Sequence, residues 1–141
     1  MPPTNRNGWI LIGLALGLIC RVATADIVVV VSAKSPVGAL SKAQVEDIFL
    51  GKTIRFPDGA LAVAIDQPEG SAIRNEFYDK VVGKTAAQIK AYWSKIIFTG
   101  RGQPPPSVSN TVEMMKRISA NPAAIGYIDR DMMNDTVRAV F

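Results

Sequence analysis

The chain has 141 residues, with 16 Lys and Arg against 12 Asp and Glu, one cysteine and no histidine. Its length fits one domain. The absence of histidine removes the commonest general base, Ser–His triads and most zinc sites, so we expect no enzyme, no metal and no cofactor. Basic and acidic residues are interspersed without a basic run, which argues against nucleic-acid binding.

Residues 1–25 are predicted to be a signal peptide. A positively charged start is followed by a short apolar run, "WILIGLALGLIC", which is too short to cross a bilayer comfortably. Ala23 and Ala25 form the small-x-small pattern of a cleavage site, so we expect the mature domain to begin at Asp26. An uncleaved anchor is the alternative, because an arginine lies close to the cut. Cleavage would remove the cysteine and two arginines, leaving 14 basic residues against 12 acids and lowering the net charge from +4 to +2.

The first part of the mature domain predicts a strand and then a helix. Residues 26–33, "DIVVVVSA", form a β-branched run without alternation, so we expect a strand covered on both faces. The helix starts after Ser41, where Gln44 completes a capping box, and Gly51 ends it.

A second strand and two more helices follow. Residues 61–66 predict the strand, and Ser71 caps a helix that Gly83 closes. Thr85 and Gln88 form a second capping box at the start of the third helix. The residues expected to face the core in these two helices are Ile73, Phe77, Val81, Ile89, Tyr92, Trp93, Ile96 and Ile97, with Tyr78 less firmly placed.

The last third of the chain predicts a proline segment, one helix and one or two strands. Residues 104–106 are prolines and exclude a helix or a central strand. A helix is expected from Asn110 or Thr111 to Ala120, and a strand over 124–129, with residues 137–141 as a candidate last strand. Alternating strands and helices predict an α/β fold with a mostly parallel sheet flanked by helices.

The segment "QPEGSAIR" carries the candidate site. It follows a strand, where α/β sheets commonly bind ligands, and it opens a helix whose first amide groups lack internal partners. An oxyanion can accept hydrogen bonds from those amides, with a serine hydroxyl and an arginine adding further contacts. We therefore predict an anion site formed by Gly70, Ser71, Ala72 and Arg74.

A purely structural role for Ser71 is the simpler alternative. As N-cap, its hydroxyl would accept a hydrogen bond from the amide of Arg74, a contribution of about 1 kcal/mol that needs no ligand. Asp66 and Glu69 lie close in the sequence, and their charges would repel an anion.

Several stretches together resemble the phosphate-binding proteins of bacterial ABC importers. They are "LSKAQVEDIFLGK", a Pro-Asp-Gly turn, "EGSAIRNEFY" and "NPAAIGYID", in matching order across nearly the whole mature chain. The resemblance implies that residues 26–141 form one lobe of a type II periplasmic-binding-protein-like fold. It also implies a periplasmic location, phosphate as the ligand, and an ABC permease as a partner.

The anion motif departs from the family pattern, which reads roughly Arg-x-x-Gly-Ser-Gly-Thr. Gly70 and Ser71 keep their places, but Gln67 replaces the arginine, Ala72 the second glycine and Ile73 the threonine. Two functions therefore stay open. The chain is a secreted phosphate- or oxyanion-binding protein linked to ABC-type transport, or it is a degenerate lobe that binds a protein partner, such as a second copy, without a small ligand. Neither requires contact with a membrane beyond the signal segment.

Overall fold

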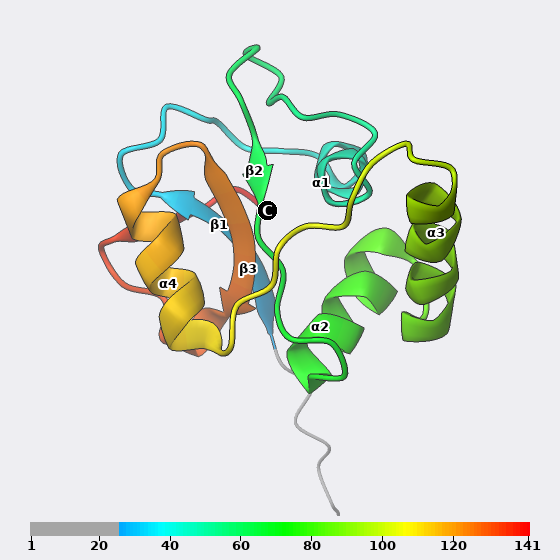
Figure 1. The fold of residues 1–141 in the computed structure, drawn as a ribbon. Helices are drawn as coiled ribbons and strands as arrows, with labels where there is room; N and C mark the ends of the chain where they lie inside the picture. The colour runs from blue at the N-terminus through cyan, green and yellow to red at the C-terminus, as the bar shows by residue number, and fades with distance from the viewer. Residues whose placement is uncertain (1–25) are drawn as a thin grey trace, which may run out of the picture.

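The computed structural model describes residues 26–141, so the predicted signal peptide and its cleavage site lie outside the described residues. Within 26–141, no helix is both long and apolar enough to cross a bilayer. A four-stranded sheet lies at the centre, with helices on both sides (Figure 1).

The strand order is β2-β3-β1-β4. β1 (Ile27–Ser32) pairs antiparallel with both β3 (Ala124–Asp129) and β4 (Val137–Ala139). β2 (Val63–Ala64) is shorter than the predicted strand and pairs parallel with β3. The candidate last strand is thus present as β4.

The prediction of a mostly parallel sheet is wrong, because β1 is antiparallel to both of its neighbours. A helix between two strands does not by itself make those strands parallel, because the chain can also return to the sheet in the opposite direction. Here β2, the strand that follows β1 in the chain, runs parallel to β3 and therefore opposite to β1. The valine run of β1 required only that both faces be covered, and antiparallel neighbours meet that requirement equally well.

Both faces of the sheet are buried, as the sequence of β1 predicted. Val29 and Val31 belong to one core, and Val28 and Val30 belong to the other. The first core is covered by α1 (Lys42–Phe49), α2 (Ala72–Phe77), the π-helical turn η1 (Tyr78–Val82) and α3 (Ala86–Phe98). The second is covered by α4 (Thr111–Ala120), on the opposite side of the sheet in Figure 1. The short 3₁₀ turn η2 (Arg130–Met132) leads from β3 toward β4.

Local hydrogen bonds at the helix ends confirm the sequence signals. The capping boxes of Ser41 with Gln44 and of Thr85 with Gln88 are both formed. Asn110 caps α4 by accepting from the amide of Glu113 at 2.9 Å.

The expectation that Ile97 of α3 faces the core is wrong. Ile89 and Trp93 are buried, but Ile97 is 54% exposed, so the buried face is narrower than the apolar stripe. The proline segment after α3 covers one side of the helix only in part, and hollows remain around Trp93.

Candidate functional site

The predicted anion site lies at the turn into α2. Gly70 has φ +81°, a left-handed conformation that glycine adopts without strain. Ser71 is the N-cap: its hydroxyl accepts from the Arg74 amide at 3.4 Å and donates to the Pro68 carbonyl at 2.6 Å. The capping role is therefore present, and the hydroxyl proton already has an acceptor within the protein.

The amides of Ala72 and Ile73 occupy the first two positions of α2. Groups at these positions have no acceptor inside their own helix. Ala72 is exposed and Ile73 is half-buried, so an anion at the surface can approach these two amides.

Asp66, at the end of the segment that contains β2, organises the other side of the turn. It is buried, and its carboxylate accepts from the Tyr78 hydroxyl at 2.8 Å and from the Tyr127 hydroxyl. It also accepts from the Gln67 amide at 2.9 Å and from Nε of Arg74 at 3.1 Å. This carboxylate joins β2, β3, α2 and η1 through one set of charge-assisted hydrogen bonds.

Arg74 does not extend toward the solvent as a free cation. Its guanidinium is paired with Asp66 and lies 4.9 Å from the ring centre of Tyr78. Burial lowers the pKa of Arg74, but the Asp66 carboxylate together with Tyr78 and Tyr127 outweighs the effect of burial, so the pKa is raised and the arginine stays charged. Within residues 26–141, only Nε of this side chain is hydrogen-bonded, which leaves the terminal nitrogens for a further acceptor.

Both tyrosines of this cluster are held neutral. Burial, and then the negative charge of Asp66, raise the pKa of Tyr78 and of Tyr127 far above the ordinary value for tyrosine. Each hydroxyl is therefore a permanent donor to the carboxylate.

Gln67 occupies the position at which the resembled family carries its arginine. Its side chain is buried and its amide nitrogen donates to the carbonyl of Tyr127 at 3.1 Å and to the hydroxyl of Thr111 at 3.4 Å. It ties the turn to β3 and α4 and does not face the solvent-exposed amides of α2.

A hollow of about 200 Å³ lies beside Arg74, between the turn into α2 and helix α3. It contains two cationic side chains, Arg74 and Lys90, and one acidic side chain, Glu69. Its remaining lining residues are Trp93, Ser94, Ile97 and Pro104.

Sequence reasoning placed Ser71 correctly and missed the cluster around Asp66. Asp66 was noted only as a charge that repels anions, whereas it is the partner of the cation expected to attract them. The signal was a carboxylate at the end of a predicted strand, but one of its partners, Tyr127, lies 61 residues away in the chain.

The fold matches solved structures of phosphate-importer binding proteins. A Clostridium perfringens chain named as a phosphate ABC transporter substrate-binding protein, solved with bound phosphate, aligns with TM-score 0.63 and 23% identity over 81% of this chain and 43% of that one. An ABC-type phosphate transport receptor from Vibrio cholerae aligns with TM-score 0.62 and 16% identity over 81% and 44%. PstS from Borrelia burgdorferi gives TM-score 0.61 and 14% identity over 81% and 46%.

These matches establish the class of fold: an α/β fold with a mixed sheet that resembles part of a phosphate-type periplasmic binding protein. The chain spans less than half of the length of the structures it matches, which agrees with a single lobe. No protein-family model matches the sequence, and no curated protein matches it significantly.

Proposed function

We propose that this chain is a secreted, periplasmic solute-binding protein that recognises a small oxyanion, phosphate first, at the start of α2. The observation that carries the proposal is the position of Arg74. Its guanidinium is fixed by Asp66 one turn inside the helix whose first amides, at Ala72 and Ile73, are free of internal partners. The likeness to proteins of phosphate import supports the choice of phosphate.

The chemistry favours weak binding. Asp66 already offsets the charge of Arg74, and the Ser71 hydroxyl is occupied, so an oxyanion would gain two or three charge-assisted hydrogen bonds. At a net worth of about 1.5–2 kcal/mol each, two such bonds correspond to a Kd of about 1–6 mM. A second lobe, a second copy or an ABC permease that closed over the turn would exclude water and tighten the complex.

Calorimetric titration with phosphate and with sulfate tests this site. The informative variant is Ala72→Pro, which removes one amide donor at the first position of the helix, where proline is well tolerated. Ser71 before it already has the extended conformation that a following proline requires, with φ −70° and ψ 145°. We expect Ala72→Pro to keep the fold and to weaken phosphate binding about tenfold.

The matched control is Ala86→Pro, the same substitution at the first position of α3, away from the proposed site. It should leave phosphate binding unchanged. The absence of heat and of a thermal shift at millimolar phosphate and sulfate would reject the proposed ligand class.

A protein-interaction module is the second candidate, and the surface of α3 favours it. Phe98 is 92% exposed at the end of the helix, and Ile97 beside it is 54% exposed. If this apolar end binds a partner or a second copy, Phe98→Ser should abolish the association without loss of stability. A wild-type protein that remains monomeric in sedimentation at high concentration and retains no protein from a periplasmic extract would reject this candidate.

A further inference from the structure

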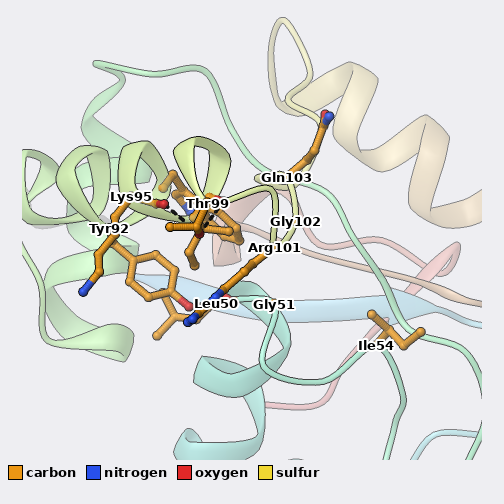
Figure 2. A pocket seen from close by; sticks show the side chains of 11 residues that line it. Leu50, Gly51, Ile54, Tyr92, Lys95, Thr99, Arg101, Gly102 and Gln103 are labelled. Atoms are coloured by element: carbon orange, nitrogen blue, oxygen red, sulfur yellow. Dashed lines mark hydrogen bonds between the residues drawn. The ribbon is translucent and has the colours of Figure 1, made fainter.

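A second and larger pocket lies away from the start of α2, between the end of α1 and the second half of α3. It measures about 510 Å³, within the range of small-molecule sites. Figure 2 shows its position beside the Arg101–Gln103 segment that follows α3. The apolar and aromatic side chains of its lining include Ile54, Tyr92, Trp93 and Ile96.

The walls of this pocket are mostly apolar. Trp93 forms part of the lining, and its Nε1–H is a buried side-chain donor without a hydrogen-bond partner in the part of the chain that the structure describes. An adjoining hollow of about 280 Å³ shares Gly51, Ile54, Trp93 and Gln103 with the pocket and continues along prolines 104–106. Together the two hollows offer a continuous apolar surface longer than the first pocket alone.

The charge of the pocket is of one sign. Lys95 and Arg101 line it, and no Asp or Glu does. The sequence carries no acidic residue from 81 to 112. In Figure 2 the side chain of Arg101 reaches inward toward Leu50 and the ring of Tyr92. Within residues 26–141, the Arg101 guanidinium forms no ion pair and no hydrogen bond.

We propose that this pocket is a second ligand site, distinct from the start of α2, for a small organic anion with an apolar body. The anionic group binds to the guanidinium of Arg101, and the apolar body lies against Trp93, Ile96 and Ile54. A planar guanidinium matches a carboxylate in two-pronged geometry, so an aromatic or branched aliphatic carboxylate fits better than an inorganic anion.

The test is a titration of the isotope-labelled full chain with phenylacetate and indole-3-acetate, followed by amide chemical shifts. We expect saturable shifts at Gly51, Tyr92 and Gly102 at millimolar probe. The neutral analogue phenylacetamide should bind at least about fivefold more weakly, and acetate should produce no saturable shift. Equal binding of phenylacetamide, or no saturation at these amides, would overturn the proposal.

Two variants and one control locate the contacts. Arg101→Gln and Ile54→Ser, both at exposed positions, should each weaken phenylacetate binding about fivefold. Lys84→Gln makes the same change in net charge outside the pocket and should leave binding unchanged. An Arg101→Gln protein that binds as well as the wild type would overturn the assignment of Arg101.

Inorganic phosphate separates this site from the one at α2. Excess phosphate should not displace phenylacetate from the pocket, and displacement would contradict the requirement for an apolar body. Failure of phosphate to bind at Ala72 would leave these expected results unaffected, because no residue tested here belongs to the start of α2.

Discussion

The buried carboxylate of Asp66 accepts hydrogen bonds from side chains of three elements of the fold. Tyr127 belongs to β3, Arg74 to α2 and Tyr78 to η1. A buried charge is tolerated only when such partners replace the water it has lost. The hydrogen bonds of Asp66 therefore stabilise the turn into α2 and also fix the position of the Arg74 guanidinium.

Loss of this carboxylate should be costly. We expect Asp66→Asn to lower the free energy of unfolding by about 3 kcal/mol, because it leaves the Arg74 charge without its buried partner. Urea denaturation measures the change. Asp79→Asn, at an exposed position, is the control and should change stability by less than about 0.5 kcal/mol; an equal effect of both variants would contradict the role given to Asp66.

The two tyrosines around Asp66 should govern stability in alkali. Their pKa values are raised in the folded protein, so their contribution is complete below the pKa of an unfolded tyrosine, about 10, and is lost as the pH rises above it. Tyrosinate absorbance during alkaline titration should show Tyr78 and Tyr127 ionising only together with unfolding, as followed by circular dichroism. Ionisation of all three tyrosines before unfolding would contradict this expectation.

Residue-level roles were predictable only where the partners are close in sequence. Ser71 accepts from the Arg74 amide as predicted, because an N-cap and its helix lie within one turn. The pairing of Asp66 with Tyr127 depends on the position of β3, which no local pattern specifies.

At the scale of elements, α4 packs closely against β3 at Gly126. A side chain on Gly126 would place its Cβ 2.5 Å from Sδ of Met114 and 2.9 Å from Cδ1 of Ile118, both fully buried. Glycine therefore allows the helix to lie directly against the strand. The close approach explains why this position, between Ile125 and Tyr127, has no side chain.

Replacement of Gly126 should disturb the packing of the second core, to which Met114 and Ile118 belong. We expect Gly126→Ala to destabilise the protein by about 1–3 kcal/mol through overpacking. The control is Gly38→Ala, where a Cβ meets nothing within 4 Å and the change should be neutral or slightly stabilising. Thermal denaturation of both variants measures the difference in stability. A Gly126→Ala protein as stable as the wild type would contradict the expectation and show that α4 can move outward without loss of stability.

Helices were predicted more accurately than strands, and the reason is physical. A capping box such as Thr85 with Gln88 is closed within one turn, so the sequence carries the whole interaction. β2 has only two residues in the sheet, and its boundaries follow from pairing with β3, which lies about sixty positions further along the chain. The exposure of Ile97 at the end of α3 was not predicted, because the apolar stripe of α3 in the sequence is as wide as that of a fully buried helix.

At the scale of the whole molecule, β1 depends on the end of the chain. Val29 exchanges backbone hydrogen bonds with the last two residues: its amide donates to Phe141 at 2.9 Å, and its carbonyl accepts from Val140 at 2.9 Å. Val140 also accepts from Leu40 at 2.8 Å, which joins the loop before α1 to the same edge. The C-terminal segment is thus a structural member of the sheet.

Removal of residues 137–141 should prevent stable folding. The deletion takes away β4 and exposes the apolar edge of β1, which favours aggregation. The control Phe141→Ala keeps the backbone and changes a side chain that is 46% exposed, so it should fold normally. A truncated protein with a well-dispersed amide spectrum and a cooperative melt would refute this dependence.

The order in which the strands are synthesised has a consequence for biogenesis. β1 is made first among the strands, yet both of its neighbours, β3 and β4, belong to the last part of the chain. The valine run of β1 therefore has no strand partner until residues 124–139 have been made, and pairing across such a separation is slow. Until those strands are made, the backbone edges of β1 are unpaired, and unpaired strand edges are sites of aggregation that chaperones cover during folding.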